Sequence, residues 1–254
     1  MMLELYHWEP NADSLALLAC LGEKALEFRS RYVDMLRLEN HAHGYLALSP
    51  HALVPVLVAE GEPMTDAGLA LQYLAERFPE PRLAPADAGH WYDVQAWMAW
   101  LGGMTGLSAT ARLLGWNYAM LKSLPAGELE AFRDKVAALP GEKRSGWDAV
   151  WSDAEADEDQ LGLAEERMVP MVAKIEAALT DADWLVGREY SIVDIAVFAH
   201  AHCLPTFVPG IVNPEQTAHT CAWLARVAAR PAVKAALAMG KPEIGPAAYT
   251  APGT

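Results

Sequence analysis

Ser14 combines a chemically useful side chain with a suitable position near the start of the chain. It follows the apolar run at residues 3–8, which predicts a strand, and stands where a helical pattern begins that extends to residue 24. A thiol with a pKa near ~8.5 is mostly protonated at neutral pH. A hydroxyl hydrogen bond and the positive end of a helix lower that pKa, and each unit corresponds to about 1.36 kcal/mol. Two interpretations follow: Ser14 stabilises a bound thiolate, or it caps the helix, for which Asp13 is an equal candidate.

The three cysteines and one pair of histidines point to no redox or metal centre. Cys20, Cys203 and Cys221 are odd in number and show no CxxC spacing, which supports neither a disulfide framework nor a zinc site. Cys20 and Cys221 stand among apolar neighbours, so we interpret them as small buried side chains. His200 and His202 have no obvious third ligand, and we place them in the core or at the surface. We therefore predict no bound metal.

The composition excludes several classes of partner. Nineteen basic and 33 acidic residues give a net charge of −14 over 254 residues. Nucleic acids and anionic membranes attract basic surfaces, so we predict neither as a partner. No apolar run approaches the ~20 residues of a membrane span, and residues 1–14 lack the features of a signal peptide. With 53% hydrophobic residues, the chain is expected to be a cytoplasmic protein with a large core.

Short strand and helix patterns alternate over the first 80 residues. Alternating apolar residues predict three strands, at residues 3–8, 26–33 and 54–58. Helical or helix-compatible stretches occupy residues 14–24 and 35–48. A tight turn is expected at residues 61–63, and a fourth strand after it completes the order β-α-β-α-β-β-α.

The last helix of this part is predicted to open at Thr65 or Asp66 and to end before Pro79. Its apolar spacing marks the side expected to face the core: Leu69, Tyr73, Leu74 and Phe78.

The second part of the chain shows only helical spacing. Two long helices are predicted from apolar stripes at Trp91, Val94, Met98, Leu101 and Met104, and at Met168, Val172, Ile175 and Leu179. Prolines and glycines interrupt residues 121–160, which we interpret as an insertion of short helices and loops. We therefore expect a first domain at residues 1–80, a linker at 81–90 and an all-helical domain at 91–254.

A motif near the C-terminus resembles a known family. Residues 187–196 look like the helix start of the glutathione transferase helical domain, in which Ser191 and Asp194 form a capping box. Residues 222–233 resemble the two final helices of that fold, with Pro231 at their junction. Together with the N-terminal order of elements, the resemblance covers roughly residues 1–240. It implies a thioredoxin-like α/β N-terminal domain followed by an all-α C-terminal domain.

A closer resemblance is to the bacterial β-aryl etherases. It rests on short segments along the chain: Leu5-Tyr6, Pro10 to Ser14, Tyr32-Val33-Asp34, Ser49-Pro50, Val54-Pro55, Thr65-Asp66 and Leu114-Gly115-Trp116. The insertion in the helical part is similar as well. These enzymes use glutathione to open the β-O-4 ether bond of lignin fragments. The resemblance therefore implies glutathione as co-substrate and an aromatic ether as second substrate.

The resemblance assigns Ser14 to the glutathione thiolate. Some transferases use a tyrosine near this point, but Tyr6 alternates with Leu3 and Leu5 and is expected to be a structural ring. Asp13 either caps the helix or contacts the cofactor.

The peptide part of glutathione is expected near Pro55, which is cis in thioredoxin-like folds. Although only about 5–6% of X-Pro bonds are cis in folded proteins, the resemblance predicts a cis bond here, with the backbone of Val54 pairing with glutathione. Thr65, Asp66 and Ala67 would hold the γ-glutamyl carboxylate. Ala67 stands where the family has serine or threonine and so lacks a hydroxyl.

A second departure from the family pattern is His51, which stands where the related etherases have arginine. A lost hydrogen bond to a charged group corresponds to roughly 1.5–3 kcal/mol, or about 10- to 150-fold in affinity. Thr65, His51 or a partner chain could supply the missing contact.

Five aromatic residues are expected to line the pocket for the second substrate, because flat aromatic walls suit an aryl ether: His7, Trp8, Trp116, Tyr118 and Trp147. The alternative is that each belongs to the core.

Three functions follow as hypotheses. The first is a glutathione transferase that releases a phenol from a β-aryl ether ketone and forms a glutathione thioether. The second, motivated by Ala67 and His51, is a non-catalytic or half-catalytic subunit of a heterodimer. The third is a general detoxifying transferase. In each case the family resemblance implies a dimer, formed with a second copy or with a related chain.

Overall fold

The first part of the chain is built on a four-stranded sheet. A computed structural model describes residues 2–10, 12–85, 87–103, 125–141, 147–148 and 158–240. The strands are β1 (Leu3–His7), β2 (Phe28–Tyr32), β3 (Val56–Ala59) and β4 (Glu62–Met64). In space their order is β2-β1-β3-β4, with β1 parallel to β2 and each of the other neighbouring pairs antiparallel.

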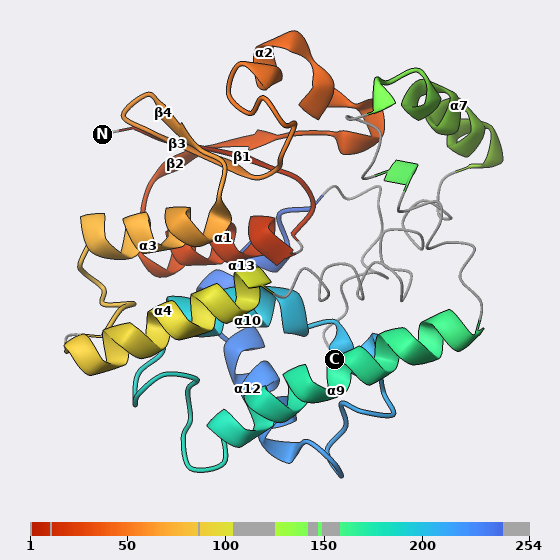
Figure 1. The fold of residues 1–254 in the computed structure, drawn as a ribbon. Helices are drawn as coiled ribbons and strands as arrows, with labels where there is room; N and C mark the ends of the chain where they lie inside the picture. The colour runs from red at the N-terminus through yellow and green to blue at the C-terminus, as the bar shows by residue number, and fades with distance from the viewer. Residues whose placement is uncertain are drawn as a thin grey trace.

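Two helices cover one face of this sheet. Helix α1 (Ala12–Glu23) and helix α3 (Ala67–Arg77) lie side by side against it (Figure 1). Between β2 and β3 the chain forms three short turns of helix: η1 (Met35–Arg37), η2 (Glu39–His41) and α2 (His43–Leu46). The predicted order β-α-β-α-β-β-α is confirmed.

The hairpin between β3 and β4 corrects one predicted turn. The turn residues are Glu60 and Gly61, with φ of 55° and 89°, and Glu62 already pairs with Ala59. The prediction of a turn at residues 61–63 was therefore wrong by one to two residues. Positive φ at both central positions suits a two-residue hairpin loop. Pro63 lies within β4, which tolerates a missing N–H because β4 is an edge strand.

Helix α3 corrects a second expectation. Asp66 caps it, because its carboxylate accepts a hydrogen bond from the backbone N–H of Leu69 at 2.8 Å. Leu69 itself is 62% exposed, although its spacing placed it in the core. The face of α3 that is buried carries Ala70, Leu71 and Leu74.

Among the described residues, every element after Met64 other than α3 belongs to an all-helical part. Its helices are α4 (Ala88–Gly103), α7 (Ala126–Ala137), α9 (Glu158–Ala178), α10 (Ile192–Ala201), α11 (Leu204–Phe207), α12 (Ala218–Ala228) and α13 (Pro231–Leu237). All four core positions predicted at residues 168–179 are buried, and the last of them, Leu179, directly follows the end of α9. In α4, Val94 is buried, whereas Met104 lies outside the described residues. None of the described helices is long and apolar enough to cross a membrane.

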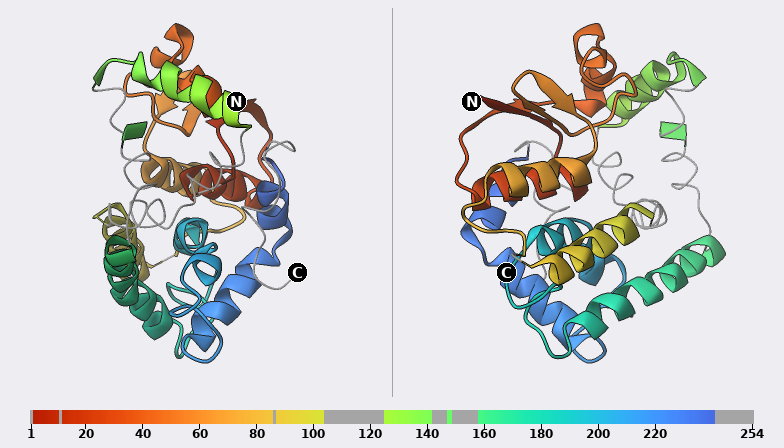
Figure 2. Two further views of the ribbon diagram at one scale, coloured as in Figure 1. Left: turned by 90° about the vertical axis from the view of Figure 1, so that its right-hand side faces the viewer. Right: turned by 60° about the vertical axis from the view of Figure 1, so that its left-hand side comes forward.

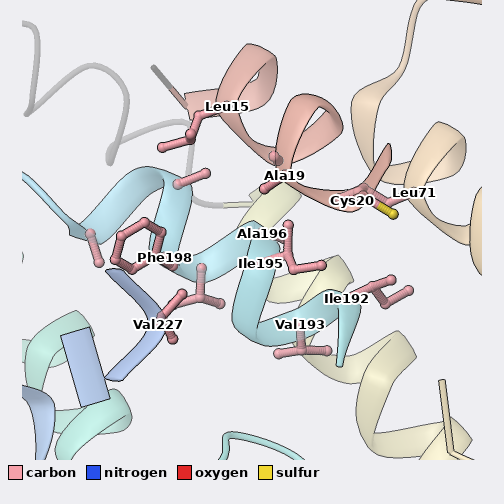
Figure 3. Close-up of a cluster of buried hydrophobic side chains, with 14 of the residues drawn as sticks. Leu15, Ala19, Cys20, Leu71, Ile192, Val193, Ile195, Ala196, Phe198 and Val227 are labelled. Atoms are coloured by element: carbon pink, nitrogen blue, oxygen red, sulfur yellow. The ribbon is translucent and has the colours of Figure 1, made fainter. Parts of the chain in front are cut away.

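Helix α10 joins the two parts of the molecule. It packs against α1 on one side and against α4 and α12 on others. Figure 3 shows Leu15 and Ala19 of α1 facing the side of α10 that carries Ala196. These side chains belong to one buried cluster that includes residues of both parts. Helix α1 is therefore fixed between the sheet and the helical part, which in turn fixes the position of Ser14.

The predicted capping box at the start of α10 is confirmed. The Ser191 hydroxyl accepts from the N–H of Val193 at 3.2 Å, and the Asp194 carboxylate accepts from the N–H of Ser191 at 3.0 Å. Asp194 also accepts from the N–H of Leu185 and from the indole N–H of Trp223. Burial raises the pKa of Asp194 to about 6, although these donors partly offset the effect.

Helix α7 comes from the segment expected to be an insertion. It lies beside the η1–α2 region of the sheet part, away from α9 and α12 (Figures 1 and 2). Phe132 and Val136 of α7 form a small buried cluster with Trp147, and this cluster packs against Met35 and Leu36. An apolar contact therefore holds α7 against the sheet part.

Candidate functional site

Ser14 lies in the first turn of α1 and is not its cap. The helix begins at Ala12, so Asp13 and Ser14 are already helical residues and the capping interpretation of both was wrong. This position places the Ser14 side chain near the N-terminal end of the helix, where the helix dipole favours negative charge.

The Ser14 hydroxyl accepts one hydrogen bond and keeps its own hydrogen available. Its Oγ accepts from the backbone N–H of Trp8 at 3.3 Å. No residue that the structure describes accepts the hydroxyl hydrogen of Ser14. The residue is only 2% exposed, so a hydrogen bond from Ser14 would form in surroundings that largely exclude water. The hydroxyl can therefore act as a donor to a bound anion.

His7 and Trp8 support this turn from within the protein. The His7 ring hydrogen-bonds the Trp8 carbonyl through Nδ1 at 2.7 Å and the Ser30 hydroxyl through Nε2 at 2.8 Å. The Trp8 ring stacks on Tyr32 with 6.4 Å between ring centroids. Both side chains are buried. Their place in the wall of a substrate pocket stays a prediction. The contacts that the structure shows are with neighbouring residues of the protein.

The strand register brings the other expected cofactor residues to the same end of the sheet. Tyr6, one residue before the end of β1, pairs with Val56, so Pro55 lies at the end of the sheet from which the chain continues to α1. Leu57 pairs with Met64, so the segment from Thr65 onward leaves the sheet at this end as well. The chain therefore leaves the sheet toward α1 and toward α3 at the same end, where Pro55 also lies.

The cis state predicted for the Val54–Pro55 bond is confirmed. Pro55 is buried and Val54 is half-buried. His51 is exposed, a few residues earlier in the loop that leads to this bond.

The start of α3 offers polar backbone to an anion. Asp66 is the N-cap, Ala67 is the first helical residue, and Thr65 is half-buried beside them. The first amide groups of a helix lack intrahelical partners, so they are suited to a carboxylate.

Asp13 points to the helical part of the molecule. Its carboxylate lies 3.3 Å from Nε2 of His200, which is on the last turn of α10. His202 is buried, and its Nδ1 donates to the carbonyl of Ala199 at 3.1 Å. The two histidines therefore turn to different partners. The described residues contain no group of three or more His, Cys, Asp or Glu that could hold a metal ion.

The remaining aromatic candidates are only partly described. Trp147 packs edge-on against Phe132 with 4.8 Å between ring centroids, inside the small cluster below α7. Trp116 and Tyr118 lie outside the described residues. Tyr6, interpreted as a structural ring, is half-buried and packs edge-on against Tyr45.

The cysteines are free, and two of them are inert. Burial raises the pKa of both Cys20 and Cys203 to about 12. The interpretation of Cys20 as a small buried side chain is confirmed. Cys221 is only half-buried, which corrects the same interpretation for that residue, and its Sγ lies 3.9 Å from the Thr217 hydroxyl.

Two polar partners of the site escaped the sequence analysis. Ser30 holds the His7 ring, and a parallel β1–β2 pair predicts this contact, since His7 pairs with Tyr32 and alternate residues of β2 share a face. His200 pairs with Asp13, but the two are far apart in sequence and no local pattern links them.

Comparison with known proteins places this geometry in a wider context. Residues 16–82 match the family model of the glutathione S-transferase N-terminal domain, and residues 116–231 match that of the C-terminal domain. Over 244 residues the chain is 33% identical to Protein LigF of a Sphingobium species, covering 92% of each chain.

Two solved structures are similar to this chain. The crystal structure of β-etherase LigF from Sphingobium superposes with a TM-score of 0.77 at 31% identity, covering 93% of this chain and 98% of that one. A Pseudomonas putida glutathione transferase, crystallised with glutathione disulfide, superposes with a TM-score of 0.71 at 19% identity, covering 94% and 92%, which shows a shared fold.

Proposed function

Since the chain belongs to the glutathione S-transferase superfamily, we propose that it is a glutathione-dependent enzyme that cleaves β-aryl ether bonds of lignin-derived aromatic ketones. The observation that carries the proposal is the hydroxyl hydrogen of Ser14, which no described residue accepts, near the end of the sheet where the chain leaves toward both α1 and α3. Glutathione carries one thiol and two carboxylates. A hydroxyl donor for the thiolate and helix amides for a carboxylate suit these groups.

Ser14 would act on the ionisation of the thiol. Its hydroxyl donates to the thiolate, and the N-terminal end of α1 adds positive potential, so both lower the pKa of the bound thiol. The thiol proton leaves to solvent. A larger fraction of bound glutathione is then ready to attack at neutral pH.

The chemical step is a displacement at the carbon next to the ketone. The thiolate sulfur forms a bond to that carbon while the bond from carbon to the aryl oxygen breaks. The electron pair of the broken bond leaves with the aryl oxide, which takes up a proton from solvent and becomes a phenol. The other product is a glutathione thioether, and no oxidant or reductant is needed.

The remaining residues would bind rather than react. The backbone of Val54 would pair with the peptide part of glutathione, and Thr65, Asp66 and Ala67 would hold its γ-glutamyl end. The Asp66 side chain already accepts from the N–H of Leu69, which leaves the amide groups at the start of α3 to contact a carboxylate. Asp13 is exposed beside Ser14 and is a further candidate contact.

A second function is favoured by two departures from the family pattern. Ala67 has no hydroxyl at the first position of α3, and His51 is exposed with no cationic arginine in its place. Each lost contact would weaken glutathione binding by about 10- to 150-fold. The chain would in this case be a half-catalytic subunit that relies on a related partner.

Either function is compatible with a dimer. Leu69 on α3 and Tyr92 on α4 are 62% and 73% exposed, and they flank the hydrogen bond between Gln72 and Gln95 that links the two helices. Exposed apolar residues on neighbouring helices support a protein contact at this surface. The partner would be a second copy or a related chain.

A calorimetric titration with reduced glutathione tests the proposal. Wild-type protein is compared with Ala67→Ser, and phenol release from a β-aryl ether ketone is followed in parallel. Micromolar to low-millimolar binding that Ala67→Ser strengthens, together with phenol release, would support the etherase. Conjugation of small electrophiles without phenol release would indicate a general detoxifying transferase. No binding in the wild type would favour the partner-dependent subunit.

A further inference from the structure

We propose that His7 is a positioning residue for Ser14, acting through the backbone of Trp8. The inference rests on the proposed function, because it assigns to His7 the task of keeping the Ser14 hydroxyl oriented toward the glutathione thiolate. It places His7 inside the protein as a support of the site, in addition to any contact with substrate.

The hydrogen bonds around His7 have a fixed direction. The Trp8 carbonyl can only accept, so Nδ1 of His7 must carry the hydrogen in their 2.7 Å contact. Burial lowers the pKa of His7 and so favours the neutral ring, in which Nε2 is an acceptor. The Ser30 hydroxyl then donates to Nε2 at 2.8 Å. The ring is held from both sides in one tautomer.

The His7 ring gives the Trp8 carbonyl the hydrogen bond that a strand partner would otherwise supply. The carbonyl of His7 accepts from the N–H of Val33 at 2.8 Å, at the point where the β1–β2 pairing ends. The next carbonyl, that of Trp8, accepts instead from the His7 ring. The backbone of residue 8 is therefore fixed where β1 has ended and α1 has not yet begun.

The fixed backbone determines what Ser14 can do. The peptide group that carries the Trp8 N–H is held by the bond from Val33 to the His7 carbonyl. The next peptide group is held by the His7 ring, and the Trp8 side chain stacks on Tyr32, so residue 8 is fixed on both sides and its N–H keeps pointing at Oγ of Ser14. While that N–H occupies one lone pair of Oγ, the hydroxyl hydrogen of Ser14 is directed elsewhere. Without the His7 contact, residue 8 gains freedom, and the orientation of the Ser14 hydroxyl is lost for part of the time.

The His7 ring contacts a titratable side chain, that of Tyr32, on the neighbouring strand β2. Tyr32 of β2 lies edge-on at 5.8 Å between ring centroids, and its hydroxyl donates to the buried carboxylate of Glu9. The Tyr32 hydroxyl is thus directed to Glu9, and the neutral His7 ring needs no counter-ion. His7 positions the site by its hydrogen bonds and not by charge.

Two amide variants separate the two nitrogens of the ring. His7→Asn places an amide N–H at the position of Nδ1, where it can reach the Trp8 carbonyl. His7→Gln places it one atom further out, where it reaches Ser30 but not that carbonyl. The ultraviolet absorbance of bound glutathione thiolate is followed against pH, and kcat and KM are measured for phenol release.

We expect His7→Gln to raise the pKa of bound thiol by about half a unit to one unit and to lower kcat on the order of fivefold, with KM for glutathione nearly unchanged. In His7→Asn, we expect the thiol pKa and kcat to stay close to their wild-type values. Equal thiol pKa and equal kcat in the two variants would overturn the proposal. If His7→Gln does not fold, Ser30→Ala, at an exposed strand position, loosens the ring from its other side. An unchanged thiol pKa in that variant would overturn the proposal as well.

Ser14→Ala distinguishes this inference from the proposed function. If Ser14→Ala leaves the thiol pKa unchanged, the thiolate role of Ser14 itself is wrong. If Ser14→Ala raises the pKa but His7→Gln does not, only the role of His7 is wrong. In the Ser14→Ala background, His7→Gln should add no further rise, since its effect passes through the serine hydroxyl.

Discussion

The indole N–H of Trp223 donates to the carboxylate of Asp194 at 2.9 Å, and this contact ties α12 to the start of α10. The same oxygen accepts from the N–H of Leu185, while the other accepts from the N–H of Ser191. One buried carboxylate therefore satisfies four donors from three segments, because the Ser191 hydroxyl also donates to it. Because α10 packs against α1, this junction supports the helix that carries Ser14.

Asp194→Ala should be strongly destabilising. It leaves three buried N–H donors and the Ser191 hydroxyl without their acceptor. Each unpaired N–H costs about 1–3 kcal/mol, so we expect a loss of at least about 3 kcal/mol in the free energy of unfolding. Urea denaturation measures it. Trp223→Phe, which removes only one donor together with its contact, is the matched control and should lose less. A loss below about 1 kcal/mol for Asp194→Ala would contradict this account of the junction.

The stability that Asp194 contributes should depend on pH. Burial raises its folded pKa to about 6, above the ordinary value of an aspartate. The folded state thus binds the proton more tightly than the unfolded state. The contribution is full below about pH 4 and is lost as pH rises through about 6. Relative to Asp194→Asn, which does not titrate there, the wild type should gain about 1–3 kcal/mol between pH 7 and pH 4.5. A constant difference over that range would show that the pKa is not raised.

Two buried tyrosines should respond to loss of the hydroxyl in opposite ways. No described residue accepts or donates a hydrogen bond at the buried Tyr190 hydroxyl, whereas the Tyr45 hydroxyl donates to the carbonyl of Leu53 at 2.6 Å. Tyr190→Phe should therefore stabilise the protein by about 1 kcal/mol, and Tyr45→Phe should destabilise it by a similar amount. Thermal or urea unfolding of the two variants checks this. If both variants change the free energy of unfolding in the same direction, the Tyr190 hydroxyl is not unsatisfied in the folded protein.

Cysteine labelling should follow burial. Cys20 and Cys203 have pKa values raised to about 12 by burial, so at pH 8 they carry almost no thiolate. Cys221 also has a raised pKa but is only half-buried. Alkylation of native protein followed by mass spectrometry should modify Cys221 first, and denaturant should remove the difference. Rapid labelling of Cys20 in native protein would contradict the packing of α1.

Trp147 can be tested against its two interpretations. Its contact with Phe132 predicts that Trp147→Ala and Phe132→Ala both lower the free energy of unfolding, by about 3–5 kcal/mol. A role in the substrate wall would add an effect on KM for the aryl ether that Phe132→Ala does not share. A variant with unchanged stability and altered KM would assign Trp147 to the pocket alone.

Sequence patterns predicted the features that depend on local chemistry. The element order, a helix start at Thr65 or Asp66, the Ser191–Asp194 box and the core stripe of α9 follow from spacing and capping rules, which act within a few residues. The cis bond before Pro55 was predicted only through the family resemblance, since bond statistics alone favour trans.

Features that depend on distant contacts were missed or misplaced. The apolar period of α3 includes Leu69, but which part of that stripe faces the core is decided by α1 and the sheet. Polar residues at positions 13 and 14 suit a cap, yet the helix begins earlier, at Ala12. The Asp13–His200 pair joins segments that no local rule connects. The domain limits at residues 80 and 91 and the form of the dimer stay predictions.

The most direct test of the central claim is the pKa of glutathione thiol bound to the wild type and to Ser14→Ala, obtained from thiolate absorbance against pH. We predict a pKa well below the ~8.5 of a free thiol in the wild type and a rise of about one unit or more in the variant, with a parallel loss of phenol release. Both proteins should bind glutathione with similar affinity at high pH. An identical thiol pKa and an identical rate in the two proteins would contradict the assignment of Ser14 and, with it, the proposed chemistry of the site.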